Sequence, residues 1–307
     1  KASPLPREEM RIPGGTLSPG PHRLPMFSLW GGCKLLAVPT TLPALRRSRR
    51  RCCSVSGANG NETGSSVLRA LSPLQREQIS LYVRALLEWN QRMNLTAVRD
   101  ESEAMARHVE DSLAIIPPLR SHYVSRCRGE GGRVDSVCDH LNVVDVGTGP
   151  GLPGLILAIA CPNWKLTLLE SMQKRCRFLE HAIGLTGLCN VQVLCDRAES
   201  VGQKLDFREA FDVAVSRAVA EMRTLAEYCL PLVRVGGLFV AAKGYDPQVE
   251  IGSAQNAVRL LGASIIDLCS VESEGPHGRR TAVICYKEHA TPRKYPRQPG
   301  VPTKMPL

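Results

Sequence analysis

A glycine-rich stretch at residues 143–154, VVDVGTGPGLPG, has the composition of a loop that holds a nucleotide. An apolar run ends in Asp145 and is followed by Gly147, Gly149, Gly151 and Gly154. Glycine permits a tight turn after a strand and lets the backbone approach a ligand closely. The last three glycines also fit GxGxxG, the dinucleotide fingerprint. The ligand to be identified is therefore NAD, ATP or S-adenosylmethionine.

An acidic residue at the end of the next apolar run predicts a contact with a ribose. Glu170 lies 23 residues after Gly147. This is close to the spacing of about 20 residues at which such proteins place the acid that binds the ribose hydroxyls. NAD and S-adenosylmethionine both carry this ribose, so Glu170 does not distinguish them.

The residues around the glycines favour S-adenosylmethionine. Asp145 places a negative charge beside the turn, which suits a cationic sulfonium with an amino group and repels a pyrophosphate. Pro150 and Pro153 remove backbone N–H donors on which pyrophosphate binding depends. The stretch CLPLVRVGGLFVAAKG at 229–244 looks like the helix, Gly-Gly turn and fifth strand of S-adenosylmethionine-dependent methyltransferases. No GxxxxGK[ST] occurs, which argues against ATP.

The elements that must position these residues alternate between buried strands and helices. Strands are expected at 141–147, 164–170, 191–197, 211–218, 238–244, 264–271 and 279–287. Helices are expected at 151–162, 171–188, 198–209, 221–236 and 246–262. The last two strands follow each other directly. The fold class is therefore α/β, an open, mostly parallel, Rossmann-like sheet with helices on both faces and an antiparallel strand near one edge. Ligands of such sheets bind beyond the carboxyl ends of the strands.

Composition divides the chain into five parts. They are a leader at 1–56, a helical unit at 57–120, a loop insertion at 121–140, the α/β domain at 141–288 and a basic, proline-rich tail at 289–307. In the helical unit, Ser72 is expected to cap a helix at 72–92, and a second helix at 100–119 is expected to stop at Pro117–Pro118.

The formal charge of +10 is concentrated at the two ends of the chain. The leader contributes +8 and the tail +4, whereas residues 57–288 carry −2. Overall basicity is therefore weak evidence that the α/β domain binds nucleic acid. The leader is rich in Arg, Ser and Pro and poor in acid, which is typical of an organelle transit peptide; a disordered basic tail is the alternative. No apolar run approaches the ~20 residues of a membrane span, so no membrane association is expected.

The twelve cysteines include no CxxC pair. Most lie in apolar runs, as small core residues do, and a reducing compartment is expected. One set, His122, Cys127, Cys138 and His140, contains metal-ligating residue types, but its spacing fits no common zinc pattern. No metal site is expected.

Six motifs occur in order between residues 70 and 307: WNQRMNLTAVRD, RHVEDSL, DVGTGPGLPG, TLLESMQKRCRFL, SRAVA and KYPRQPGVPTKMPL. Together they resemble the glucose-inhibited division protein B family, the methyltransferases that modify guanine N7 in small-subunit ribosomal RNA. The resemblance omits only 121–140. It implies a class I methyltransferase fold with a seven-stranded sheet and S-adenosyl-L-methionine as cofactor. It also implies a monomeric enzyme whose partner is the ribosomal RNA of a subunit or an assembly intermediate. The tail is similar to that of Gram-positive and cyanobacterial members. With the leader, this implies an organelle protein, in the plastid first and the mitochondrion second.

The resemblance also assigns roles to residues of the cofactor site. Gly147, with Gly149 beside it, and Leu152 would line the cofactor loop, Ala198 and Glu199 would meet the adenine, and Arg217 would close the site. Glu170 suits the ribose on both grounds. Asp145 either contacts the methionine end, directly or through water, or stabilises the turn.

The expected chemistry needs no general base, because guanine N7 carries a lone pair and no proton. The fourth strand reads AVSRAVA and lacks the [DN]PP[YFW] that binds an exocyclic amine. Holding the base and the sulfonium in line would then supply most of the rate. Arg217 and Lys243, at the carboxyl ends of strands, are candidates for positioning the base; a structural ion pair is the alternative for Arg217.

Other residues are candidates for contacts with RNA or with the sheet. Arg293, Lys294 and Arg297 would contact phosphates, or else belong to a solvated tail. Asn94, Thr96, His108 and Asp111 either cap the pocket or tie the helical unit to the sheet. Two other functions remain open: an NAD(P)-dependent oxidoreductase, and a non-catalytic ribosome assembly factor on a methyltransferase fold.

Overall fold

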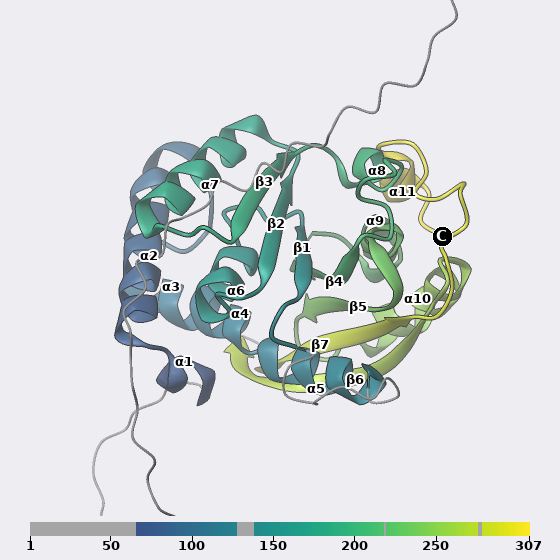
Figure 1. Ribbon diagram of the computed structural model, residues 1–307, viewed down its shortest axis with the longest axis horizontal. Helices are drawn as coiled ribbons and strands as arrows, with labels where there is room; N and C mark the ends of the chain where they lie inside the picture. Colours follow the sequence, from purple (N-terminus) through teal and green to yellow (C-terminus); the bar gives the residue numbers. More distant parts are fainter. Residues whose placement is uncertain (1–65, 128–137, 218, 276–277) are drawn as a thin grey trace, which may run out of the picture. The chain divides into compact units, whose positions relative to one another are not determined.

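The computed structural model describes residues 66–127, 138–217, 219–275 and 278–307, and a seven-stranded sheet runs through their centre (Figure 1). The strands are β1 (Asn142–Val146), β2 (Lys165–Glu170), β3 (Val191–Cys195), β4 (Phe211–Arg217), β5 (Val233–Lys243), β6 (Ala263–Gly275) and β7 (Gly278–Lys287). Their order is β3-β2-β1-β4-β5-β7-β6, and only the two pairs that involve β7 are antiparallel. The predicted α/β class is confirmed.

The central strands are apolar throughout because both of their faces are buried. Successive side chains of a strand point to opposite faces. Val143 accordingly packs into the core on one face and Val144 into the core on the other, and both are fully buried. In β4, Val213 and Val215 share the face of Val143, whereas Ala214 shares that of Val144. Such strands read as continuous apolar runs, as the sequence does here.

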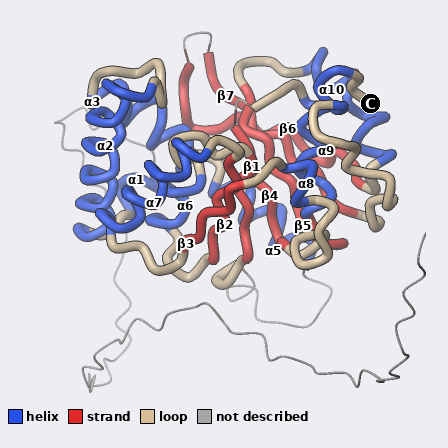
Figure 2. Tube along the Cα trace, turned by 90° about the horizontal axis from the view of Figure 1, so that it is seen from above, coloured by secondary structure: helices blue, strands red, loops and turns tan. Residues whose placement is uncertain are grey.

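Helices cover the two faces of the sheet (Figures 1 and 2). One face carries α2 (Pro73–Met93), α5 (Ile116–Cys127), α6 (Gly154–Ala160) and α7 (Gln173–Thr186), and the other carries α9 (Met222–Cys229) and α10 (Gln248–Leu260). A short helix, α1 (Ser66–Ala70), precedes α2, and α8 (Ala198–Val201) follows β3. The predicted start of α2 is confirmed, because the Ser72 hydroxyl accepts the Gln75 N–H and the Gln75 side chain accepts the Ser72 N–H.

The segment after α2 differs from the prediction of one helix followed by a loop. It contains α3 (Glu101–Ala104), a π-helical stretch η1 (Met105–Glu110), α4 (Asp111–Leu113) and then α5. Pro117 and Pro118 lie in the first turn of α5 and do not end a helix. Prolines are tolerated there because the first N–H groups of a helix have no partner within it. The predicted loop is therefore wrong for 121–127, and 128–137 lie outside the described residues.

The Gly-Gly pair that was expected to end a helix lies inside a strand. α9 ends at Cys229, a 3-10 turn η3 (Leu230–Leu232) follows, and β5 begins at Val233. A Cβ on Gly237 would lie 2.5 Å from the carbonyl oxygen of Asp212 in the neighbouring strand. The pairing of β4 with β5 shifts register at this point. Glycine is needed here for close strand approach, not for a turn between helix and strand.

The proline-rich tail packs against the domain. Tyr295 is buried, and a short helix α11 (Val301–Lys304) lies near the C-terminus. The Arg208 guanidinium donates to the carbonyl oxygens of Tyr295 and Thr291, at 2.7 Å each. These contacts fix the path of the tail between β7 and α11. The predicted leader at 1–56 lies outside the described residues. Among those described, none of the helices has the length and apolar character that crossing a bilayer requires.

Candidate cofactor site

The loop after β1 is held by backbone contacts to the neighbouring strand. The N–H groups of Gly147 and Thr148 both donate to the Leu169 carbonyl oxygen, at 2.9 and 3.2 Å. Gly147 has a φ of +69°, and a Cβ there would lie 2.7 Å from a methyl carbon of Val219. A side chain at this position would therefore be both strained and in collision with the segment after β4. The loop requires glycine at 147.

Asp145 lies beneath this loop and is fully buried. Its Oδ2 accepts the Thr148 hydroxyl at 2.6 Å and the Gly154 N–H at 2.8 Å, so the carboxylate joins the strand end to the start of α6. Burial raises the pKa of Asp145 to about 6. Asp145 does not line the cavities described below, and the geometry gives it the turn-stabilising role. A contact with the methionine end through water stays a prediction.

Glu170 connects the end of β2 to the glycine loop. Its Oε2 accepts the Gly149 N–H at 3.0 Å, and its Oε1 accepts the Met172 N–H at 2.8 Å. The side chain is 4% exposed, and the Arg175 guanidinium lies 3.7 Å away. Two backbone donors thus fix both carboxylate oxygens at the edge of the cavities. Each oxygen keeps a further lone pair with which to accept a ligand hydroxyl.

Two cavities share a wall at the carboxyl ends of the parallel strands. The first has a volume of about 420 Å³ and the second of about 400 Å³. Both are lined by Gly147, Glu170, Ser171 and Val219. Ala198 and Glu199 line only the first cavity, whereas Gly149, Leu152 and Arg217 line only the second. Apart from Asp145, every residue predicted to bind the cofactor lines one of these cavities.

The C-terminal tail supplies part of the first cavity, which the sequence did not indicate. Thr303 and Pro306 lie in its lining. The buried Glu199 carboxylate accepts the Gly300 N–H at 2.9 Å, and the hydroxyls of Tyr228 and Thr303 are 2.8 Å apart. These residues lie in the tail motif KYPRQPGVPTKMPL, but the motif does not show what they contact, because that depends on where the chain returns after β7. The tail thus closes the cavity that Glu199 lines.

Arg217 lies at the end of β4 in a network with the helical unit. Its guanidinium donates to the Arg107 carbonyl oxygen at 3.3 Å and lies 3.9 Å from the Asp111 carboxylate. Arg280 contacts the same carboxylate at 2.7 Å, and the Ser273 hydroxyl also donates to it. Burial lowers the pKa of Arg217, while Asp111 opposes that shift. Asp111 therefore ties the helical unit to the sheet and orients Arg217 towards the second cavity.

His108 and Thr96 line the second cavity beside Arg217. His108 Nε2 and the Thr96 hydroxyl are 2.7 Å apart. Burial and then the nearby Arg217 charge lower the pKa of His108 to about 4, so its ring is neutral at pH 7. Asn94 ends α2 in the left-handed conformation. It lines a third hollow of about 800 Å³ that shares Leu95 and Thr96 with the second cavity.

Two of the predicted base- or RNA-binding cations are engaged elsewhere. Lys243 donates to Glu250 at 2.6 Å and to the Ala220 carbonyl oxygen at 2.8 Å, is 10% exposed and lines neither cavity. Arg297 pairs with Glu227, which is 0% exposed, through contacts of 2.6 to 3.1 Å. Buried carboxylates recruit a cation because an unpaired charge is costly there. Both residues are placed as structural ion pairs.

The other two basic residues predicted to contact phosphate, Arg293 and Lys294, are exposed on the tail. The Lys294 ammonium lies 5.2 Å from the ring centre of Tyr295. Both side chains are therefore accessible to a phosphate. The contact with phosphate itself stays a prediction.

The donor and acceptor groups fit S-adenosylmethionine. Glu170 offers acceptors for ribose hydroxyls at the wall that the two cavities share. The Oδ1 atom of Asp145, beneath the glycine loop, is buried and has no hydrogen-bond partner among the described residues. In the glycine loop, the N–H groups of Gly147, Thr148 and Gly149 all donate within the protein, so they are not available to bind a pyrophosphate.

Comparisons with known proteins identify the family of the chain. The family model GidB, described as rRNA small subunit methyltransferase G, matches residues 75–277. The ribosomal RNA small subunit methyltransferase G of Moorella thermoacetica is 41% identical over 237 residues, which are 77% of this chain and 92% of that protein. The protein of the same name from Symbiobacterium thermophilum is 44% identical over 236 residues, 75% of this chain and 89% of that one. Among solved structures, the Methanococcus jannaschii fibrillarin pre-rRNA processing protein is 15% identical, with a TM-score of 0.40 and coverage of 48% of this chain and 68% of that chain. The chain belongs to the GidB family of rRNA small subunit methyltransferase G proteins.

Proposed function

We propose that this protein transfers a methyl group from S-adenosylmethionine to N7 of a guanine in small-subunit ribosomal RNA. The observation that carries the proposal is the pair of cavities that share Gly147 and Glu170, with Arg217 in the second. The first has the groups to hold an adenosine, and the second lies beside it with a cation that can bind a base. The relatives named above are ribosomal RNA methyltransferases, which supports RNA as the substrate class.

The residues of the first cavity would hold the cofactor. Glu170 would accept the ribose hydroxyls, and Ala198 and Glu199 would contact the adenine. When bound, S-adenosylmethionine supplies a methyl group on a positively charged sulfur. The protein's own task is then to exclude competing nucleophiles and to place the guanine ring in line with that methyl group.

The second cavity suits a ring nitrogen as the acceptor. Guanine N7 loses no proton on methylation, so no base is required, and the neutral His108 is available as a hydrogen-bonding group instead. The Arg217 guanidinium is a suitable donor for the guanine O6 acceptor, which lies next to N7. Arg217 is 15% exposed and already fixed by Asp111, so little ordering of its side chain is required on binding.

The third hollow favours a substrate in which the RNA around the target guanine is single-stranded. It adjoins the second cavity and is lined by polar side chains from the end of α2 and from the segment that follows it, among them Asn90, Gln91, Asn94 and Arg99. A guanine that enters the second cavity must leave its stack, and its neighbours need polar contacts outside. This arrangement favours a nucleotide in a loop or an open region of the RNA.

The test is a methyl-transfer assay on small subunits that lack the modification. Reductive strand scission at N7-methylguanine reads the product directly. The Arg217→Gln variant should lower the rate about a hundredfold with unchanged cofactor binding, since misplacement of a reacting group costs that much. Arg280 still pairs with Asp111 in this variant, so the fold should persist. The Arg259→Gln variant, altered on the exposed face of α10, is the control. Methylation at another guanine atom, or none by the unaltered protein, would refute the proposal.

We further propose that residues 1–56 direct the protein to the plastid. Their support is composition: ten basic residues, two acidic ones and abundant Ser and Pro. A fusion of 1–56 to a fluorescent protein should enter plastids, whereas entry into mitochondria or retention in the cytosol would overturn the assignment.

We also propose that the enzyme acts as a monomer on a ribosomal particle. Size-exclusion chromatography with light scattering, and rates on naked RNA against particles, test those two points.

A further inference from the structure

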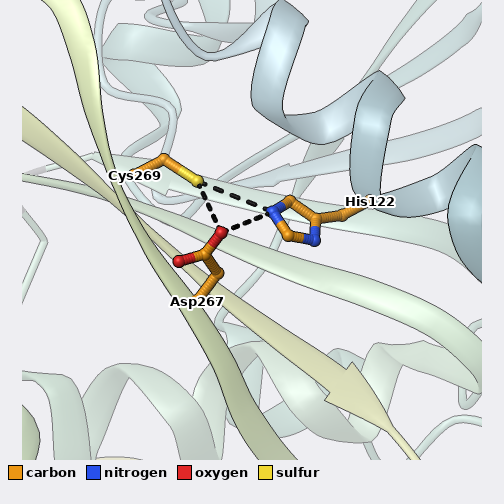
Figure 3. A group of neighbouring side chains, drawn as sticks. All are labelled: His122, Asp267 and Cys269. Carbon is orange, nitrogen blue, oxygen red and sulfur yellow. Dashed lines mark hydrogen bonds and ion pairs between the residues drawn. The ribbon is translucent and has the colours of Figure 1, made fainter.

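Three side chains from two distant segments converge at the edge of the sheet, away from the residues that line the two cavities. His122 comes from α5, and Asp267 and Cys269 come from the edge strand β6 (Figure 3). Asp267 Oδ2 lies 2.9 Å from His122 Nε2 and 3.3 Å from Cys269 Sγ, and Sγ lies 3.6 Å from Nε2. One atom from each side chain thus faces a common point.

Local structure explains why these three residues meet. Positions 267 and 269 are two apart in a strand, so their side chains point to the same face. Helix α5 packs over this part of the sheet, with Leu119 and Tyr123 in the core and His122 at its border. The His122 side chain is 22% exposed and that of Asp267 is 45% exposed. An ion and its water can therefore reach the group from solvent.

The three separations match those within a tetrahedral zinc site. Zinc binds nitrogen and oxygen at about 2.0–2.1 Å and thiolate sulfur at about 2.3 Å, which places N and O about 3.3 Å apart and S about 3.6 Å from either. The observed values of 2.9, 3.6 and 3.3 Å lie within about half an ångström of these. The other carboxylate oxygen, Oδ1 of Asp267, accepts the Leu268 N–H at 2.7 Å and leaves Oδ2 for the ion. Ligating carboxylates are commonly held in this way.

We propose that His122, Asp267 and Cys269 form a zinc site that joins helix α5 to the edge strand β6. A thiolate with an imidazole and a carboxylate disfavours magnesium and calcium, which take oxygen ligands, and suits zinc. Three protein ligands leave the fourth position to a water molecule. Binding replaces the Cys269 thiol proton, which passes to solvent, and no electron is transferred. The site does not depend on the proposed methyl transfer.

The histidine was visible in the sequence, but its partners were not. The cysteine and histidine residues that follow His122 most closely in the sequence are Cys127, Cys138 and His140. In the structure Cys138 is buried and contacts the Arg120 carbonyl oxygen, and His140 is exposed. The two actual partners lie 145 and 147 residues further along the chain, so no local spacing pattern could connect them.

Cobalt substitution tests the site directly. The full-length, untagged protein is stripped with a chelator and titrated with Co²⁺, and the thiolate-to-cobalt charge-transfer band is recorded. The unaltered protein should saturate at one equivalent with tetrahedral visible bands, and Zn²⁺ should displace the cobalt. Cys269→Ser should abolish the charge-transfer band, and His122→Ala should weaken binding about tenfold or more. Cys189→Ser, altered at an exposed cysteine, is the matched control and should behave as the unaltered protein does.

Thermal unfolding gives a second readout that separates a zinc site from a hydrogen-bonded cluster. Zinc at a hundredfold excess over its Kd should raise the Tm by about 5 °C in the unaltered protein and in Cys189→Ser. Asp267→Asn keeps the size of the side chain and one acceptor oxygen for the Leu268 N–H, but it removes the charge and the second oxygen and should lose most of that shift. A band that survives in Cys269→Ser, or a Tm that ignores zinc in the unaltered protein, would overturn the proposal. Neither readout involves methyl transfer, so a failure here leaves the proposed function standing.

Discussion

Replacing Glu170 by alanine should weaken S-adenosylmethionine binding far more than RNA binding. A hydrogen bond to a charged acceptor contributes about 1.5–3 kcal/mol. The loss of even one ribose contact should therefore raise the cofactor Kd about 10- to 150-fold. The variant also frees the N–H groups of Gly149 and Met172, which lie 3.0 and 2.8 Å from the carboxylate. Each unsatisfied donor costs about 1–3 kcal/mol when buried, and the open cavity places the cost near the lower end. A loss of about 2 kcal/mol in the free energy of unfolding is expected.

Titration calorimetry with the cofactor and filter binding with RNA measure the two affinities. Glu170→Gln separates the roles, because it keeps the volume and one acceptor oxygen but removes the charge. Glu77→Ala, on the exposed side of α2, should change neither affinity. The decisive comparison uses a cofactor product analogue without the two ribose hydroxyls. The analogue should bind the unaltered protein more weakly than the full product does. In Glu170→Gln, whose affinity for the product is already reduced, the analogue should bind about as well as the product. If the difference in affinity between the two ligands is the same in both proteins, Glu170 only holds the loop and the ribose assignment is wrong.

Three further predictions concern the tail and the histidine. Arg297→Ala should lower the free energy of unfolding by about 3–5 kcal/mol in urea titrations, because it leaves the buried Glu227 charge unpaired. A loss below about 1 kcal/mol would show that Arg297 behaves as a solvated surface residue and not as a structural partner of Glu227. Replacing Arg293 and Lys294 together by alanine should leave stability unchanged and make the salt dependence of RNA binding shallower by about 1.4 in log–log slope; an unaltered slope would exclude both from phosphate contact. The pKa of His108 is lowered to about 4 in the folded protein. The unfolded chain therefore binds more protons between about pH 6.5 and 4, so stability should decrease as the pH is lowered from about 6.5 to 4. His108→Asn should flatten this fall, and an equal fall in the variant would assign it to other groups.

The sheet was predictable because its signals are local. The apolar runs around Val143 and Val213 and the glycines after β1 each report burial or turn geometry within a few residues. The errors arose where tertiary contacts decide. Pro117–Pro118 look like a helix end in isolation, yet they suit the first turn of α5. The Gly236–Gly237 pair looks like a turn, yet Gly237 is required by the approach of Asp212 from another strand.

The same division applies to the site. The positions of Glu170 and the glycine loop follow from strand ends, so residue spacing placed them correctly at the cavities. Which basic side chains are free could not be predicted, because Lys243 and Arg297 have their acidic partners on other elements. GxGxxG was a coincidence of spacing. Gly154 of that pattern contacts Asp145, and a Cβ there would lie 2.8 Å from the carboxylate, so its role is packing at the start of α6.

The closure of the first cavity by the tail makes cofactor binding depend on a segment that lies outside both the sheet and the glycine loop. Thr303 and Pro306 belong to its wall, and the Glu199 carboxylate accepts an N–H from Gly300. A change that displaces the tail from Glu199 would therefore open the pocket while every strand of the sheet stays in place. Substitutions at 300–306 should act on the affinity for the methyl donor through this wall, although none of these residues belongs to the glycine loop.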